Sequence, residues 1–456
     1  MSATNPVRYP DTNAPELMTK RAWWLVVLNV LIPGSAQLLA GNRRLGRFGV
    51  ASTFVLWGLA IIGAALFFFA QSVFVTIATH WLTLWLVQAA IVFYLALWVV
   101  LTLDTMRLVR LVRLVRVDRA ARGFVAGLAI VALAVVGGVG AYGVVVAGAT
   151  RDAVGIVFAD GQVEPPVDGR YNIMLLGGDA GPDRDGLRPD SISVASIDAE
   201  TGQTVIFGIP RNLEYVPFQA DSPLAAQYPS GYGWDGCAVD VCYINSIYTE
   251  VELYSADLYP DAAAGGSRPG IEATRDAVEG VLGLTIQYYV LIDMYGFAQL
   301  IDALGGIDID VQERLPIGGG EDEYGNPVDV GAWIEPGVQH MDGNTALWYA
   351  RSRHGTSDYD RMSRQREVQE AILRQAEPTN VLSKFQAVAQ AGSQVVSTDI
   401  PQTMLGVFSQ LALKAREFPV TDIDFVPASG IEPEDPDYAY IRELVVGATA
   451  PPPADE

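Results

Sequence analysis

The chain has 456 residues, too long for one ordinary domain, and combines a formal net charge of −22 at pH 7 with a mean hydropathy of +0.24. Two compositions are averaged in these values, because residues 1–122 carry 12 Lys and Arg against 4 Asp and Glu, whereas the remainder carries 18 against 48. A basic apolar part followed by an acidic part is typical of a membrane anchor joined to a water-exposed domain, and we expect no nucleic acid as a partner of so acidic a domain.

The N-terminal part predicts a tail and an all-helical membrane anchor over 22–149. Residues 1–21 are polar, contain no cleavable signal and are expected to be disordered. The apolar segment 22–40 is broken by Pro33-Gly34, so it either spans the bilayer or turns back within it. Three further segments are long enough to span, with a short loop containing His80 between the first two: 48–70, 81–103 and 124–149.

Arginines recur at every third position before the last of these segments. They are Arg107, Arg110, Arg113, Arg116, Arg119 and Arg122. This spacing winds around a helix instead of holding one face, which disfavours a voltage sensor and favours a cytoplasmic helix over 107–122 that contacts anionic membrane lipid. The positive-inside rule then predicts a multi-pass cell-membrane protein whose domain after Thr150 is extracytoplasmic.

The acidic part predicts an α/β fold, a mixed sheet with helices on both faces. Residues 150–170 read as an extended linker. Apolar runs bounded by Gly, Pro and Asp predict strands at 171–176, 191–197, 204–209, 285–292 and 307–311. Helices are predicted at 269–282, 295–304, 342–350 and 359–375, with a weaker helical region to about 415. We place the main α/β domain at 171–376, a helical extension at 377–447 and a disordered tail at 448–456.

Five arginines gather between Tyr349 and Arg366, against the charge of the surrounding domain. They are Arg351, Arg353, Arg361, Arg364 and Arg366. The simplest explanation for a basic cluster in an acidic domain is that it binds a phosphate or pyrophosphate.

Helical periodicity organises the second half of this cluster. If 358–365 is helical, Asp358, Arg361 and Gln365 share one face, with Arg364 beside them. The alternative is a solvated charged helix whose first turn is closed by a capping box between residues 357 and 360.

Charged residues also occur where the predicted strands end. Asp179 follows the strand 171–176, Arg188 and Asp190 directly precede the next strand, and Arg211 follows a third. Ligands in open α/β sheets gather at strand ends, so two carboxylates and arginines here suit a divalent cation beside a phosphate. Chance occurrence of such residues in acidic loops is the alternative.

The only cysteines are Cys237 and Cys242. Their spacing suits a small local disulfide if the domain lies outside the cytoplasm, and otherwise a pair of free thiols.

Seven motifs in this order resemble the LytR-CpsA-Psr family of cell-envelope glycopolymer transferases. The resemblance covers about residues 170–376 and rests on "NIMLLGGD", "RPDS", "GIPRN", "YIN", "YYVLIDMYGFAQLIDALGGIDIDV", "GVQHMDGNTALWYARSRH" and "DYDRMSRQR". It implies transfer of a glycopolymer from a polyprenyl pyrophosphate carrier to peptidoglycan through a phosphodiester, assisted by Mg²⁺.

The resemblance also implies roles for individual residues. Asp179 and Asp190 match the metal-binding carboxylates. The positions around the pyrophosphate are matched by Arg188, Arg211, Arg351, Arg353, Arg361 and Gln365, with Arg364 adjacent; we expect Arg188, Arg211, Arg351 and Arg353 to act in catalysis.

One departure from the family pattern concerns the proton acceptor. Asn212 stands where the family usually has aspartate, and Asp358 is our candidate for the general base because a helix would place it one turn before Arg361. Phosphoryl transfer requires positioning and charge neutralisation more than a nucleophilic side chain, so His340 and His354 are expected to be structural. Two rival functions are a pyrophosphatase or phosphodiesterase with the same site, and a non-catalytic lipid-binding or sensory membrane protein.

Overall fold

The computed structural model describes residues 7–11, 14–109, 119–157, 163–178, 188–233, 236–322, 327–352, 357–375 and 396–450. The chain forms two compact units, Met1–Arg151 and Asp152–Glu456. We describe each unit by itself.

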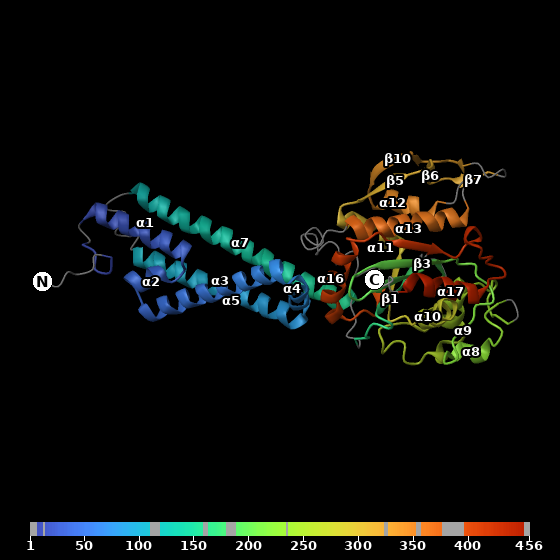
Figure 1. Cartoon of the computed structure of the whole chain (residues 1–456). Coiled ribbons are helices and arrows are strands. Elements are labelled where there is room, and N and C mark those ends of the chain that lie inside the picture. Colours follow the sequence, from blue (N-terminus) through green and yellow to red (C-terminus); the bar gives the residue numbers. More distant parts are fainter. Residues whose placement is uncertain are drawn as a thin grey trace, which may run out of the picture. The chain divides into compact units, whose positions relative to one another are not determined.

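The first unit is helical (Figure 1). Its helices are α1 (Pro15–Leu31), α2 (Ser35–Ala40), α3 (Arg43–Phe69), α4 (Gln71–Thr79), α5 (Trp81–Val109) and α7 (Arg119–Val157). In the described part of the chain, three helical segments are long and apolar enough to cross a membrane: Arg43–Phe69, Trp81–Val109 and Ala126–Gly148. They confirm the three predicted apolar helices.

The boundaries of the first unit differ from the prediction at its start. Helix α1 begins at Pro15, a residue favoured in the first helical turn, so the expected disorder of residues 1–21 is wrong from there on. Arg21 explains this order, because its guanidinium is buried and donates to the carbonyls of Val7 at 2.6 Å and Leu108 at 2.8 Å. The expected break at Pro33-Gly34 is present, with Gly34 at a φ of +97° between α1 and α2.

Two connections are helical where loops were expected. The segment between α3 and α5 forms α4 instead of a short loop. Helix α7 continues to Val157, so the predicted linker 150–170 is wrong over its first residues; residues 163–166 have no regular secondary structure. Most of the arginine-rich helix predicted at 107–122 lies outside the described residues.

The second unit is built on a mixed six-stranded sheet of order β11-β4-β1-β2-β3-β12. Its strands are β1 (Arg170–Gly178), β2 (Pro189–Asp198), β3 (Thr204–Ile209), β4 (Tyr288–Asp293), β11 (Val396–Thr398) and β12 (Thr421–Asp424). Strand β2 is antiparallel to both β1 and β3, whereas β4 runs parallel to β1 and β12 parallel to β3. The predicted α/β class and the first three strands are confirmed.

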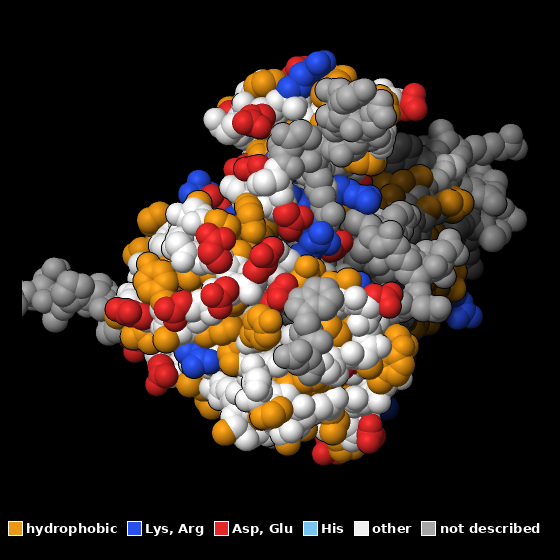
Figure 2. Space-filling view, turned by 90° about the vertical axis from the view of Figure 1, so that its right-hand side faces the viewer, with side chains coloured by type: hydrophobic (Ala, Val, Ile, Leu, Met, Phe, Trp, Pro, Cys, Tyr) orange, Lys and Arg blue, Asp and Glu red, His pale blue; other side chains and the backbone are white. Residues whose placement is uncertain are grey.

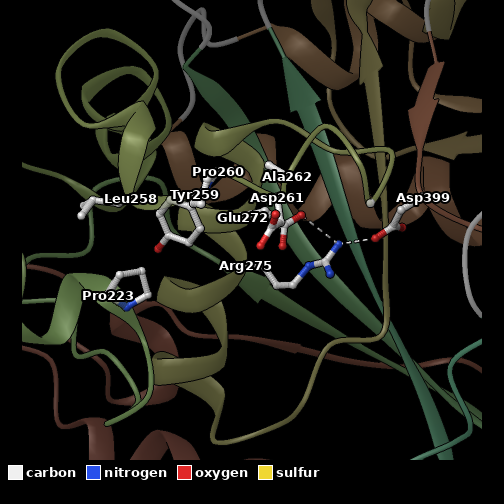
Figure 3. Close-up of a pocket in the computed structure, with 10 residues that line it drawn as sticks. Pro223, Leu258, Tyr259, Pro260, Asp261, Ala262, Glu272, Arg275 and Asp399 are labelled. Carbon is white, nitrogen blue, oxygen red and sulfur yellow. Dashed lines mark hydrogen bonds and ion pairs between the residues drawn. The ribbon is translucent and has the colours of Figure 1, made fainter.

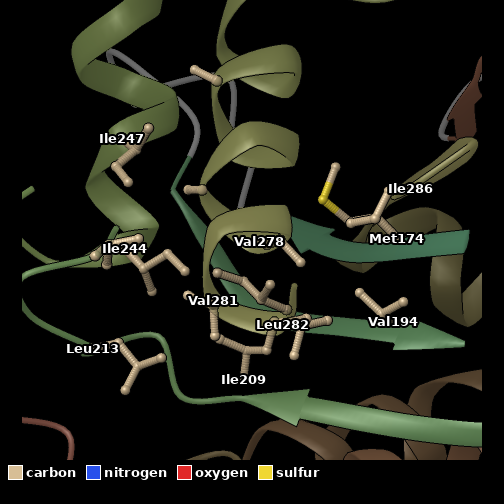
Figure 4. Close-up of a cluster of buried hydrophobic side chains, with 14 of the residues drawn as sticks. Met174, Val194, Ile209, Leu213, Ile244, Ile247, Val278, Val281, Leu282 and Ile286 are labelled. Carbon is tan, nitrogen blue, oxygen red and sulfur yellow. The ribbon is translucent and has the colours of Figure 1, made fainter. Parts of the chain in front are cut away.

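One face of the sheet packs on α9 (Ile247–Tyr254), α10 (Pro269–Leu282) and α17 (Tyr438–Thr449). Figure 4 shows strand residues such as Met174 and Val194 directed toward Val278 and Val281 of α10. The alternation of the strands places these apolar side chains on one face, where removing them from water supplies the main stabilisation.

The other face carries α11 (Met294–Leu304), α12 (Gly343–Arg351), α13 (Asp358–Gln375) and α16 (Leu405–Ala415) (Figure 1). A smaller apolar core beneath α11, α12 and α13 includes the strand β5 (Ile307–Val311), which pairs antiparallel with β10 (Gly337–Met341). The remaining strands form two short pairs: β6 (Leu315–Ile317) with β9 (Ala332–Ile334), and β7 (Gly320–Glu321) with β8 (Pro327–Val328).

The C-terminal region is not the purely helical extension predicted for 377–447. It supplies α16 and α17 but also both edge strands of the sheet, β11 and β12. Helix α17 ends at Thr449, and its N-cap Asp437 accepts from the backbone of residues 439 and 440. The expected disorder from residue 448 therefore starts too early.

The two cysteines form a disulfide with each other. Cys242 is buried and directly precedes a segment that bonds the chain after β3: Ile244 donates its N–H to Leu213 O at 3.0 Å, and Asn245 donates to Arg211 O at 3.3 Å. The disulfide therefore closes a loop beside the backbone of Arg211.

The acidic excess of the second unit is visible on its surface. Figure 2 shows a face on which Asp and Glu side chains clearly outnumber Lys and Arg. Some of the acidic excess is also half-buried: Glu279 on α10 accepts from the backbone N–H of Ile286 at 2.7 Å, and partial burial raises the pKa of its carboxyl to about 7.

This half-buried carboxyl predicts a pH-dependent stability. Between the unfolded pKa of about 4.3 and the folded pKa of about 7, the folded state keeps a proton that the unfolded state has lost, so stability falls as pH rises through this window. Glu279→Gln keeps the acceptor but does not titrate. We expect it to be more stable than the wild type by about 2 kcal/mol at pH 8, about 5 °C in unfolding midpoint, and to show no such gain at pH 4.

The measurement is thermal unfolding of the full chain in detergent at both pH values. Glu443→Gln, an exposed carboxyl on α17, is the matched control and should show no pH-dependent gain. An equal gain in both variants would contradict the assignment to burial.

Candidate active site

Several strand ends converge at one edge of the central sheet. Gly178 at the end of β1 pairs with Pro189 at the start of β2 and with Asp293 at the end of β4. The pairing of Ile192 with Ile209 brings the end of β3 to the same edge. The end of β1, the start of β2 and the end of β3 therefore lie at the same edge, as expected for a ligand site in an α/β sheet.

Four charged residues from three elements meet at this edge, and we call them the charged cluster: Asp190, Arg211, Asp358 and Arg361. Arg211 contacts both carboxylates, with Nη1 2.5 Å from Asp190 Oδ1 and Nε 3.4 Å from Asp358 Oδ2. Arg361 Nη2 lies 3.0 Å from the Asp358 carboxylate and 3.2 Å from Asp190 O. Two guanidinium groups and two carboxylates thus form one network.

The start of α13 presents two members of the charged cluster. Ser357 and Asp360 form the anticipated capping box: the N–H of Ser357 donates to Asp360 Oδ2 at 2.7 Å, and the N–H of Asp360 donates to Ser357 Oγ at 3.1 Å. Asp358 and Arg361 follow at i and i+3 on the inward face, where Arg361 is only 3% exposed. The capping box and the charged face, which the sequence left as alternatives, coexist.

Arg364 and Gln365 bind the end of α12. Arg364 Nε donates to Tyr349 O at 3.0 Å, its Nη2 donates to Ser352 O, and Gln365 Nε2 donates to Ala350 O at 3.3 Å. The last carbonyls of a helix have no partner within the helix, so these bonds satisfy them. Both side chains therefore hold the C-terminal end of α12.

Of the arginines predicted at 351 and 353, the structure describes Arg351. Arg351 ends α12, is exposed, and places its guanidinium 5.3 Å from the centre of the Trp348 ring. Arg353, like His354 and Asp179, lies outside the described residues. Arg188 directly precedes β2 and is half-buried. Its charge acts on Tyr232, whose hydroxyl donates to the buried carboxylate of Glu250 at 2.6 Å.

Asn212 and His340 have defined neighbours. Asn212 directly follows Arg211, and its side chain lies near the hydroxyl of Tyr359, one residue after Asp358, so it lies beside the charged cluster. The ring nitrogens of His340 lie 2.7 Å from Asp308 Oδ1 and 3.0 Å from Gly305 O, which fits the structural role expected of it.

The sequence did not reveal a second ion pair near this edge. Arg366, 3% exposed, has Nε 3.2 Å from Asp424 Oδ1 at the end of β12. Gly208 of β3 permits this contact, since a Cβ there would lie 1.7 Å from the same oxygen. The partner could not be foreseen, because Asp424 falls beyond the predicted strands and helices.

The expected Mg²⁺ prefers carboxylate and water oxygens. Asp190 is the described carboxylate that would hold it, and its Oδ1 lies 2.5 Å from Arg211 Nη1. Among the described residues, no group of three or more His, Cys, Asp or Glu side chains is arranged to hold a metal ion.

The family whose model matches this chain is described as the LytR_cpsA_psr family, and the match covers residues 150–430. Biofilm regulatory protein A of Streptococcus mutans is 35% identical over 149 residues, which are 32% of this chain and 35% of that protein. A polyisoprenyl-teichoic acid–peptidoglycan teichoic acid transferase TagU of Halalkalibacterium halodurans is 35% identical over 133 residues, 29% of this chain and 40% of that protein. The chain thus spans less than half the length of each of these relatives.

Among solved structures, Bacillus subtilis TagV is similar over 62% of this chain and 97% of that chain, with 22% sequence identity and a TM-score of 0.43.

The ion pairs of α13 predict a contrast between two arginines on this helix. Arg366→Ala leaves Asp424 at the sheet edge without its guanidinium, so we expect a loss of about 3 kcal/mol in stability, or about 8 °C in unfolding midpoint. Arg374→Ala removes an exposed pair with Glu370 four residues earlier and should cost less than about 0.5 kcal/mol. Thermal unfolding of the full chain in detergent measures both, and similar losses would show that the pair with Asp424 contributes no more than a surface pair.

Proposed function

Because the chain belongs to the LytR_cpsA_psr family, we propose that it is a membrane-anchored phosphotransferase that attaches a polyprenyl-pyrophosphate-linked glycopolymer to peptidoglycan through a phosphodiester bond. The charged cluster carries this proposal. The printed name of the TagU relative supports the substrate class, since that protein is a polyisoprenyl-teichoic acid–peptidoglycan teichoic acid transferase.

The chemistry of the charged cluster suits a diphosphate. Phosphoryl transfer needs phosphates held in line and their charge neutralised, and it needs little covalent help from the protein. Arg211 and Arg361 come from separate elements and present guanidinium groups that can form two parallel bonds to phosphate oxygens. In the absence of phosphate, the carboxylates of Asp190 and Asp358 balance these charges.

The proposed reaction forms one P–O bond and breaks another. A hydroxyl oxygen of the acceptor attacks the phosphorus attached to the glycopolymer, and the bond from that phosphorus to the bridging oxygen of the diphosphate breaks. Polyprenyl phosphate leaves with the electron pair, and arginines neutralise its new charge. The hydroxyl proton passes to a base, for which Asp358 at the start of α13 is the candidate.

Two groups assist this chemistry in the proposal. Mg²⁺ held by Asp190 and Asp179 would neutralise phosphate charge. Arg351 and Arg353 would extend the arginine set from the end of α12, which Arg364 and Gln365 hold. Arg364 then acts mainly by positioning the end of α12, because its donors are directed at backbone carbonyls.

The anchor fits a substrate dissolved in the bilayer. We propose that the three apolar helical segments cross the membrane, that the arginine-rich loops stay in the cytoplasm, and that the second unit lies outside the cell. A lipid carrier would then deliver its diphosphate from the membrane to the catalytic domain.

Arg211→Ala tests the charged cluster. Its side chain is 29% exposed, so we expect the fold to survive, while transfer of lipid-linked polymer to peptidoglycan falls about 100-fold through the loss of one fixed donor. The assay measures the labelled polymer bound to peptidoglycan after incubation with the purified full chain. Arg314→Ala, which removes an exposed arginine paired with Glu335, is the matched control and should keep full activity.

The products separate the rival functions. Release of free polymer phosphate in equal amounts with and without peptidoglycan would identify a hydrolase instead. Unchanged polymer attachment by the Arg211 variant would contradict a catalytic role for the charged cluster.

Metal removal gives an independent prediction. We expect chelation with EDTA to reduce transfer at least about 10-fold and added Mg²⁺ to restore it, because the metal neutralises charge that develops in phosphoryl transfer. Asp190→Asn should be inactive and not rescued by Mg²⁺. Full activity in EDTA would contradict the magnesium assignment.

A further inference from the structure

A second site lies at the opposite end of the sheet strands from the charged cluster. Asp399 lines this site. It follows β11, and its Oδ1 accepts from the N–H of Tyr289 at 2.8 Å, near the start of β4. The pocket there has a volume of about 350 Å³. It is lined by Pro223, Leu258, Tyr259, Pro260, Asp261, Ala262, Gly265, Glu272, Arg275 and Asp399 (Figure 3).

The charges that line this pocket do not balance. Arg275 is the only basic residue among them, and its guanidinium pairs with Asp399 and, at 3.5 Å, with Glu272 (Figure 3). Asp261 adds a third carboxylate from the loop before α10. Because both pairs use the same Nη2 group, Arg275 is directed toward protein carboxylates and the pocket keeps a net charge of two negatives.

The acidic excess continues behind the pocket wall. Asp276 accepts from the hydroxyl of Tyr259 at 2.7 Å and from Ser222 Oγ at 2.5 Å. Burial raises the pKa of this carboxyl in spite of both donors. The bond from its own hydroxyl to Asp276 fixes the Tyr259 ring, so the wall offers an aromatic surface of defined orientation.

We propose that this pocket binds a small organic cation, an ammonium-bearing ring of the size of an amino sugar. Carboxylates on one side and the fixed Tyr259 ring on the other recognise an ammonium group and the apolar face of a ring, respectively. Leu258, Pro223 and Ala262 supply the apolar contacts that such pockets use.

Two other ligand classes fit less well. An anion would meet three carboxylates and an arginine that is already paired with two of them. A metal ion needs converging ligands, and in the described part of the chain no His, Cys, Asp or Glu group of three or more is so arranged.

Ligand-observed NMR on the full chain in detergent tests this assignment. Glucosamine, which carries the ammonium group, should receive saturation from the protein and bind with a millimolar dissociation constant. N-acetylglucosamine has the same ring without the charge and should bind at least about 5-fold more weakly.

Three variants locate the binding. Asp261→Asn and Glu272→Gln each remove one pocket carboxylate and should weaken glucosamine binding at least about 5-fold. Asp257→Asn removes an exposed carboxylate four residues before Asp261 that does not line the pocket, and binding should change less than about 2-fold.

Equal binding of both sugars, no binding of either, or equal effects of the Asp257 and Asp261 variants would each overturn the proposal. Because the measurement reads binding and not transfer, its outcome is independent of the function proposed for the charged cluster.

Discussion

The attachment of α13 to the edge of the central sheet is the interaction on which the candidate active site depends. Arg361 reaches Asp190 at the start of β2, and Arg366 reaches Asp424 at the end of β12, so one helix is tied to two strands. A buried ion pair brings little net stability, because removing charges from water costs about as much as their attraction returns. The ion pair instead favours one position of the helix over others, because a shift of the helix would leave a buried charge without a partner. This arrangement fixes the position of arginines that a purely apolar contact would leave less well defined.

The side chains beneath α13 fit this arrangement. The sheet presents Ser193 and Gly208 toward this helix, and Gln369 Nε2 donates to Ser193 Oγ at 3.3 Å. The opposite face of the same strands carries large apolar side chains such as Phe207 and Val194, which pack in the main core. One face therefore supplies most of the stability, and the other uses small and polar residues to admit charged side chains. Successive side chains of β2 and β3 point to opposite faces of the sheet, so each strand contributes apolar residues to the main core and small or polar residues to the face under α13.

The sequence predicted those parts in which local pattern and tertiary structure agree. The central strands have continuous apolar runs, and α10 has both a helical period and a proline at its start, so their positions were confirmed. The edge strands β11 and β12 have three and four residues and no apolar run, and only their pairing with β4 and β3 makes them strands. The convergence of Asp190 and Arg211 could be predicted from strand ends. The hydrogen-bond partners of Arg364 could not be predicted. Residue spacing shows which face of the helix a side chain occupies, but it does not show whether the guanidinium donates to a phosphate or to a backbone carbonyl.

The acidic character of the second unit places a physical condition on the proposed function. A polyanionic substrate is repelled by a domain whose sequence after residue 122 carries 48 acidic and 18 basic side chains. At physiological ionic strength, however, exposed charges are screened beyond about 8 Å, whereas contacts at 3 Å are not. Repulsion between the polymer and the acidic surface thus weakens within a short distance. A diphosphate placed between Arg211 and Arg361 interacts with both guanidinium groups without this screening. In this proposal the acidic surface would discourage the polymer from binding elsewhere on the domain, and the local arginines would select its one diphosphate.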